Sequence, residues 1–110
     1  MSGISTHILD TSRGRPATGV AVKLERSDST GSWAEVARGV TDQDGRIPTL
    51  FADPTAGEYR VRFAIEAYAQ SQGYTAFYPE VVVHVRLDGG GRYHLPLLLS
   101  PFGYSTYRGS

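Results

Sequence analysis

The chain has 110 residues, and its eleven Lys and Arg side chains balance its eleven Asp and Glu side chains. This length suits one domain, residues 1–110, with a single core, and a balanced charge argues against nucleic-acid binding, which relies on a basic excess. The absence of cysteine excludes disulfides and thiolate metal sites and fits a reducing compartment. The first residues hold neither a basic stretch nor a long apolar run, so we expect no signal peptide, no membrane span and a cytoplasmic location.

Thirteen glycines and six prolines divide the chain into short pieces, which favours an all-β fold. Between them, apolar and polar residues alternate, as in strands with one buried face. Strands are expected at 4–11, 20–26, 33–40, 47–51, 59–65, 81–87, 93–100 and 104–108. In 66–72, Ala and Gln favour a two-turn helix instead. We therefore predict a two-sheet antiparallel sandwich of about eight strands with one short helix.

Turn signals connect these segments. Residues 10–19 form a polar loop with Gly and Pro, and the Asp-Gly pair at 44–45 is a strong turn signal that places Arg46 at the start of a strand. The Ser100-Pro-Phe-Gly103 step separates the last two strands. The residues that follow keep Tyr, Arg and hydroxyl side chains up to Ser110, which suggests a site; an edge strand that merely closes a sheet explains them equally well.

The three histidines differ in their surroundings. His84 shares its strand face with Val82, Arg86 and Asp88, which predicts a solvated surface position. His7 and His94 each lie mid-strand, on a partly apolar face that a ligand or a second subunit could cover. The alternative is a pair of unrelated histidines in a sheet.

No known phosphate-loop or zinc-protease motif is present, and Gly89-Gly-Gly91 opens no helix, so these glycines form a turn. Two histidines without acidic or thiol neighbours make a weak metal site, and no metal is expected. Arg46 alone would be interpreted as a solvated turn residue.

Several separated motifs together resemble one family. They are Ile4-Ser-Thr-His-Ile-Leu-Asp-Thr11 with the following Gly14, Pro16, Ala17, Gly19 and Val20, then Thr41-Asp-Gln-Asp-Gly-Arg46, Phe77-Tyr-Pro-Glu-Val81, His94-Leu-Pro-Leu-Leu-Leu-Ser-Pro101 and Tyr104-Ser-Thr-Tyr-Arg-Gly-Ser110. In order and spacing they resemble the 5-hydroxyisourate hydrolases, transthyretin-related enzymes of urate breakdown. The final Tyr-Arg-Gly-Ser is the signature of the enzyme as opposed to the hormone carrier transthyretin. Arg92 departs from the pattern, since many relatives have histidine there, and this affects only a peripheral contact.

The resemblance implies a fold, an assembly and a site. The fold is an eight-stranded sandwich, assembled as a homotetramer, a dimer of dimers with sites at the dimer–dimer interface. The catalytic residues would be His7, Arg46, His94 and Ser110. The substrate, 5-hydroxyisourate, would contact His7, Arg46, Tyr107, Arg108 and Ser105. Neither a cofactor nor a membrane nor nucleic acid is implied.

The expected reaction is the ring opening of 5-hydroxyisourate by water to 2-oxo-4-hydroxy-4-carboxy-5-ureidoimidazoline. One of His7 and His94 would take the proton from water, and Arg46 would stabilise negative charge. Two alternatives stay open at this point: a small-molecule carrier that uses the same channel, and a purely structural β-sandwich.

Overall fold

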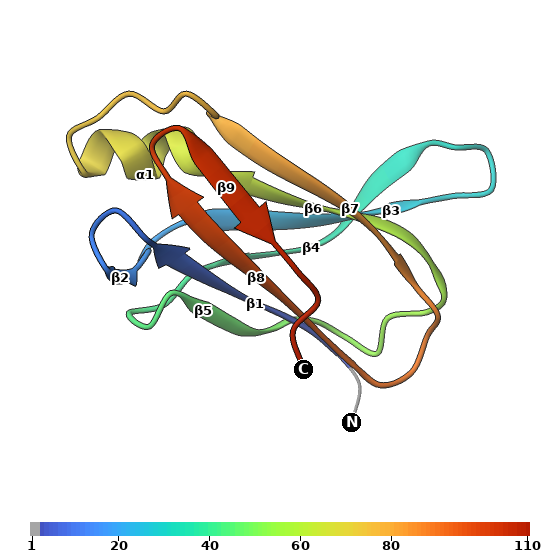
Figure 1. Ribbon diagram of the computed structural model, residues 1–110. Coiled ribbons are helices and arrows are strands. Elements are labelled where there is room, and N and C mark those ends of the chain that lie inside the picture. Colours follow the sequence, from blue (N-terminus) through green and yellow to red (C-terminus); the bar gives the residue numbers. More distant parts are fainter. Residues whose placement is uncertain (1–2) are drawn as a thin grey trace.

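The structure, a computed structural model, describes residues 3–110 and has two layers of β-sheet with one helix at one end (Figure 1). The elements are β1 (Gly3–Asp10), β2 (Arg15–Pro16), β3 (Ala21–Ser27), β4 (Trp33–Val40), β5 (Arg46–Ala52), β6 (Gly57–Ala64), α1 (Ile65–Ser71), β7 (Glu80–Leu87), β8 (Arg92–Ser100) and β9 (Gly103–Thr106). The predicted sandwich with one short helix is confirmed. Within the described part of the chain, the additional strand is the two-residue β2, which lies inside the predicted loop.

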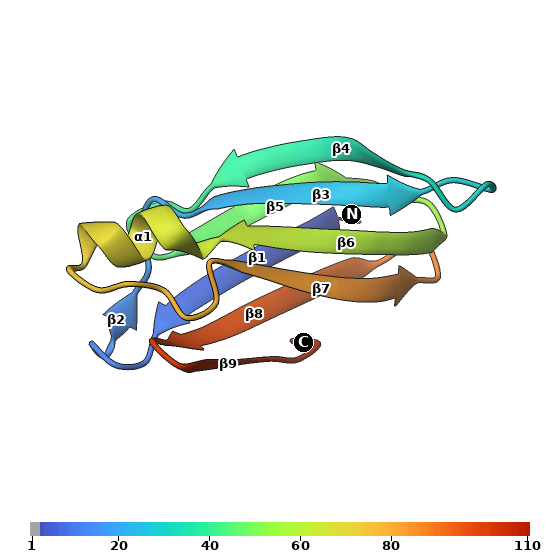
Figure 2. The same cartoon turned by 90° about the horizontal axis from the view of Figure 1, so that it is seen from above.

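The first sheet has the strand order β2-β1-β8-β9, and β5 also pairs with β1. The second sheet has the order β4-β3-β6-β7, and Figure 2 shows it stacked on the first. The pairs are antiparallel except for β1 and β8, which run parallel along their whole length. A parallel pair needs a long connection, and most of the chain lies between these two strands. This pairing brings the start of the sequence next to its end.

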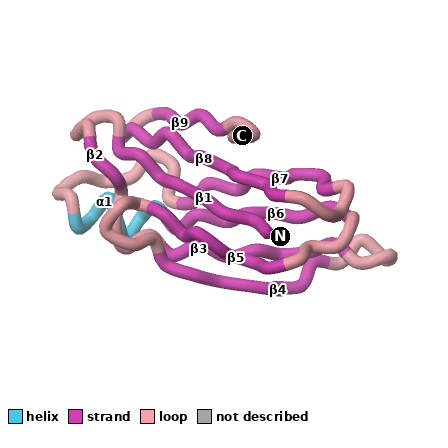
Figure 3. Tube along the Cα trace, turned by 90° about the horizontal axis from the view of Figure 1, so that it is seen from below, coloured by secondary structure: helices cyan, strands magenta, loops and turns pink. Residues whose placement is uncertain are grey.

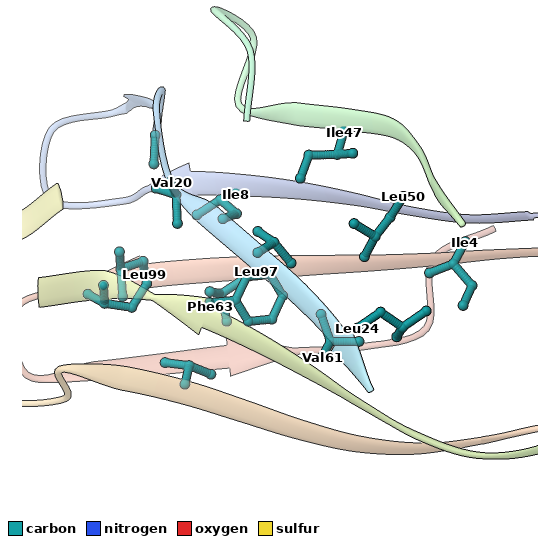
Figure 4. Packing of buried hydrophobic residues seen from close by; sticks show 14 of the residues in the cluster. Ile4, Ile8, Val20, Leu24, Ile47, Leu50, Val61, Phe63, Leu97 and Leu99 are labelled. Carbon is teal, nitrogen blue, oxygen red and sulfur yellow. The ribbon is translucent and has the colours of Figure 1, made fainter. Parts of the chain in front are cut away.

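The core lies between the two sheets and follows the predicted alternation. In β1, Ile4, Thr6 and Ile8 are buried, and Ser5, His7 and Leu9 face outward and are half-buried. Figure 4 shows Ile4 and Ile8 packed among buried apolar side chains of the other strands. The largest fully buried side chains include Ile8, Leu24, Tyr59, Phe63, Leu97 and Leu99. Burial of one face of each strand therefore turns the other face of β1 and β8 toward the outside.

Helix α1 closes one end of the sandwich, as Figure 3 shows, and is held there by a buried polar contact. The Tyr68 hydroxyl donates a hydrogen bond of 2.6 Å to the Asp10 carboxylate at the end of β1. Burial raises the pKa of the Tyr68 phenol, and the hydrogen bond to Asp10 raises it further. No helix among residues 3–110 is long and apolar enough to cross a membrane.

Candidate active site

Three strands of the first sheet bring the predicted site residues together on its outer face. His7 on β1 lies directly opposite Arg46 on β5. On its other side, β1 pairs with β8, so that His7 lies opposite Pro96 and Ser5 lies opposite His94. Directly opposite residues share a face of a sheet. His7, Arg46 and His94, far apart in the sequence, therefore belong to one patch of surface.

His94 is held by a neighbouring strand. Its Nδ1 atom lies 2.8 Å from the Ser5 hydroxyl oxygen, and its ring is half-buried. Burial lowers the pKa of the His94 imidazole, and the charges of His7 and Arg46 lower it further. Since an ordinary histidine has a pKa near ~6.5, the His94 ring is neutral at pH 7. A neutral, oriented imidazole can accept a proton from water.

Arg46 is positioned by the predicted turn. The Asp42 carboxylate accepts a hydrogen bond of 2.9 Å from the Arg46 backbone N–H, and the Asp42 backbone N–H donates one of 3.0 Å to the Arg46 carbonyl. The turn contains Gly45 with φ of 72°, and a Cβ atom there would lie 2.5 Å from the Ile8 carbonyl oxygen. Only glycine combines this conformation with so close an approach. The Asp-Gly turn thus allows the start of β5 to lie close to β1, next to His7.

The end of the chain continues along β8. Ser105 in β9 lies opposite Leu98, on the outer face, and β9 ends at Thr106. An isolated bridge then pairs Gly109 with His94, and the Gly109 N–H donates a hydrogen bond of 2.7 Å to the His94 carbonyl. Continued in this register, Tyr107 lies opposite Pro96, on the same face as His7. Its side chain is 55% exposed.

An open hollow of about 330 Å³ lies among the predicted site residues. Its lining consists of Ser5, Arg46, Pro48, Arg92, His94 and Ser110. It contains two guanidinium groups and no acidic side chain, so it suits a polar ligand that carries or develops negative charge. His7 lies beside it, opposite Arg46.

Three residues of this lining were not predicted as site residues: Pro48, which follows Arg46 by two residues on β5, and the polar residues Ser5 and Arg92. Ser5 could have been found, because it shares the outer face of its strand with His7; its contact with His94 depends on the parallel pairing of β1 and β8. Arg92 was interpreted as part of a peripheral contact only, whereas the structure places it in the wall of the hollow. Ser5 and Arg92 each lie two residues from a predicted histidine, on the same face of the strand.

Arg108, a predicted site residue, does not line this hollow. Its guanidinium lies over the Tyr93 ring, 5.0 Å from the ring centre. It lines a mainly apolar cavity of about 260 Å³ together with Val85, Leu95 and His94, between β7 and β8, two strands that Figures 2 and 3 show side by side. No group of three His, Cys, Asp or Glu side chains that could hold a metal ion occurs in residues 3–110.

Comparisons with known proteins show the family of this chain. Residues 4–109 match the model of the HIUase/Transthyretin family. The 5-hydroxyisourate hydrolase of Salmonella dublin is 46% identical over 110 residues, which cover 97% of this chain and 80% of that protein. Among solved structures, Klebsiella pneumoniae 5-hydroxyisourate hydrolase matches with a TM-score of 0.87 and 40% identity over the full length of both chains.

The fold alone does not separate enzyme from carrier. Sea bream transthyretin, solved in complex with thyroxine, matches with a TM-score of 0.92 and 39% identity, covering 96% of this chain and 93% of that chain. In this chain, the outer face of β1, β5 and β8 carries His7, Arg46 and His94. By sequence, architecture and site, this chain belongs to the HIUase/Transthyretin family.

Proposed function

We infer that this protein hydrolyses 5-hydroxyisourate, opening its six-membered ring to give 2-oxo-4-hydroxy-4-carboxy-5-ureidoimidazoline in urate degradation. The relatives named 5-hydroxyisourate hydrolase, at 40–46% identity over nearly the whole chain, support this activity. The observation that carries it is the meeting of His7, Arg46 and His94 on one sheet face, with His94 oriented by Ser5.

We assign the general base to His94. In the tautomer whose Nδ1–H donates to the Ser5 hydroxyl oxygen, Nε2 is the nitrogen that can take a proton from water. Burial lowers the pKa of the imidazole, and His7 and Arg46 lower it further, which favours the neutral ring that a base requires. His7, on the adjacent strand opposite Arg46, would hold the substrate on the other side.

Arg46 would stabilise the negative charge. When water adds to the ring carbonyl and gives a proton to His94, the carbonyl oxygen becomes an oxyanion. The carbon–nitrogen bond then breaks as the proton passes from His94 to the leaving nitrogen, which leaves a carboxylate on one side and the ureido group on the other. A guanidinium offers two parallel N–H donors to such oxygens. Ser110, which lines the same hollow, can donate a further hydrogen bond.

Substrate contacts beyond these residues would come from Ser105 and Tyr107. Ser105 lies on the outer face opposite Leu98, and the register directs Tyr107 to the same side. An exposed tyrosine ring beside a polar hollow offers a flat surface for a planar heterocycle.

We further propose that the enzyme is a homotetramer, a dimer of dimers with its sites at the dimer–dimer interface. Two features favour association. The hollow is open on the outside of the sheet, and the large apolar side chains Phe77, Phe102 and Tyr107 are 65%, 79% and 55% exposed. Sedimentation equilibrium of the purified protein tests this, and a monomer would contradict it.

A cytoplasmic site of action fits the lack of cysteine and is tested by cell fractionation.

The decisive experiment follows the ultraviolet decay of freshly made 5-hydroxyisourate with and without the protein. The proposal requires decay well above the spontaneous rate, in proportion to protein concentration. Equilibrium binding of thyroid hormone without hydrolysis would instead favour the carrier function, which the match to thyroxine-bound sea bream transthyretin makes the relevant rival.

A further inference from the structure

The segment 107–110 completes the hollow, yet it has few attachments. The β8–β9 ladder ends at Thr106, and beyond it the structure gives one backbone hydrogen bond, from the Gly109 N–H to the His94 carbonyl, within the described residues. With so few backbone hydrogen bonds, the place of Ser110 in the hollow depends on side-chain contacts of this segment.

Arg108 provides a second attachment, on the opposite side of β8. Its side chain lies over the ring of Tyr93, 5.0 Å from the ring centre, and lines the cavity between β7 and β8. It is not among the residues that line the hollow. A cation over an aromatic face is attracted by the electron density of the ring. Arg108 is exposed and lies over Tyr93 at the edge of this cavity, which His94 also lines, and it does not line the hollow.

The ring that Arg108 contacts is itself fixed. Tyr93 is 7% exposed, and its hydroxyl donates a hydrogen bond to the Asp88 carboxylate. This hydrogen bond lowers the pKa of the Asp88 carboxyl, and the charge of Arg108 lowers it further. The three side chains thus form one unit, which we name the tail clamp: Asp88, Tyr93 and Arg108.

On the other face, the clamped segment lies against the candidate base. A Cβ atom on Gly109 would be 2.6 Å from the His94 ring carbon Cδ2 and 3.3 Å from His94 Cβ. The Gly109 backbone therefore lies directly against the imidazole and helps to exclude water from it. Any movement of this segment changes the surroundings of His94.

We propose that Arg108 is a positioning residue: by stacking on Tyr93 it holds residues 107–110 in place, so that Gly109 packs against His94 and Ser110 reaches the hollow. This inference rests on the proposed hydrolase function. It assigns Arg108 an action through the tail clamp in place of direct contact with the substrate, which the family resemblance alone would suggest.

The test compares Arg108→Gln with Arg86→Gln in the full-length protein. Arg86 lines the same cavity and is exposed, so its variant controls for loss of a charge at that place. Three quantities are measured: the steady-state constants, the exchange rate of the Gly109 amide by NMR, and the pH titration of the His94 ring. Sedimentation of each variant confirms an unchanged assembly.

The proposal expects Arg108→Gln to lower kcat by about two- to fivefold, as loss of an exposed cation–π contact would, with little change in KM. The Gly109 amide should exchange faster by a similar factor. The pKa of His94 should rise toward its ordinary value, because burial, the main cause that lowers it, is relieved. Arg86→Gln should leave all three unchanged.

Other results overturn the proposal. A raised KM with unchanged Gly109 exchange would mean that Arg108 contacts the substrate directly, and an equal loss in Arg86→Gln would mean that the cavity charge matters and not the clamp. Tyr93→Leu supplies a second test: combined with Arg108→Gln it should lower kcat no further than either change alone, and multiplying losses would contradict coupling. If the unmodified protein lacks hydrolase activity, the proposed function fails, while the exchange and titration measurements still decide whether the clamp exists.

Discussion

The outer faces of the two sheets both carry histidine and arginine, but the two faces pair these residues differently. On the second sheet, His84 Nε2 lies 2.8 Å from Glu58, Arg60 pairs with Glu25 at 2.9 Å, and Arg62 pairs with Glu80 at 2.7 Å. On the first sheet, His94 is half-buried against the Ser5 hydroxyl, and the hollow beside it is lined by Arg46 and Arg92 without any acidic side chain.

This difference explains why one face is a structural surface and the other a candidate site. On the second sheet the positive charges are neutralised by nearby carboxylates, and Trp33 covers Arg60 with the guanidinium 4.1 Å from the ring centre. On the first sheet Arg46 and Arg92 face a hollow. Burial lowers the pKa of His94, and interactions with His7 and Arg46 lower it further. Both sheets carry a histidine on the outward face of a strand, and the residues next to that histidine decide whether its imidazole can act as a base.

The largest contrast is expected between the two histidines. His94→Ala should lower kcat/KM by about 10²–10⁴, the usual contribution of a general base, with the oligomeric state unchanged. His84→Ala removes an exposed contact with Glu58 and a ring contact with Trp33 and should leave the activity unchanged. Both are measured by ultraviolet decay of 5-hydroxyisourate. An unaltered rate in His94→Ala would show that His94 is not the general base.

The second-largest difference in activity is expected between arginine variants of the two sheets. Arg46→Ala removes the group that faces the developing oxyanion, and we expect a loss of about 10²–10³ in kcat. Arg60→Gln, on the other sheet, breaks a pair of partly exposed charges that contributes at most ~1 kcal/mol to folding, and its kcat should stay near that of the unmodified protein. Thermal unfolding distinguishes the two effects. Equal losses of activity would show that the contrast between the faces is false.

Two glycines of the last hairpin provide a steric test. Gly109→Ala would place a methyl group 2.6 Å from the His94 ring, so either the ring or the segment must move, and a displacement of about 1 Å can cost ~10²-fold in rate. At Gly103 the nearest atom to an added Cβ is the Ser100 hydroxyl at 3.7 Å, an ordinary contact. Gly103→Ala should therefore retain activity. A fully active Gly109→Ala would place the segment away from His94.

The pH dependence should show the charges around His94. Because burial and the charges of His7 and Arg46 lower its pKa, kcat/KM should fall only when the pH drops below the ordinary histidine value of ~6.5. Arg46→Gln removes one of these charges, raises the pKa of His94 and moves the acid limb of the residual activity to higher pH. An acid limb that stays in place would exclude this coupling.

The same depressed pKa affects stability. Between the lowered pKa and ~6.5, the unfolded chain binds more protons at position 94 than the folded one, so stability rises with pH there. The contribution is fully present above ~6.5 and is lost as the pH falls through the folded-state pKa. Urea unfolding of the unmodified protein and of His94→Gln at pH 5 and pH 8 measures this difference.

The smallest effect is expected at Arg92. It lines the hollow but is exposed, so water screens its charge, and Arg92→Gln should raise KM by no more than about fivefold. Lys23→Gln, on an exposed position of the other sheet, is the matched control. A loss of 10² or more would make Arg92 a second oxyanion-stabilising group.

The strands and their buried faces could be predicted from local pattern, because alternation reports which side of a strand is apolar. The strand at 33–40 agrees to the residue, and the others agree within two residues at each end. The Asp-Gly turn before Arg46 could also be predicted from the sequence, since backbone conformation at a tight turn depends on a few neighbouring residues. The separate motifs were enough to suggest the family and three of the four candidate catalytic side chains on one face: His7, Arg46 and His94.

Which strands lie side by side was settled only by tertiary packing. Alternation has a period of two and assigns a residue to a face, but it carries no information about the neighbouring strand. The parallel pairing of β1 with β8 therefore could not be predicted, and with it the contact of Ser5 with His94 and the place of Arg92 in the hollow. Likewise, the direction of Arg108 toward Tyr93 depends on a register that continues past the last regular strand. Local sequence decided where the strands form and which side each buries; the packing of distant strands decided which side chains meet.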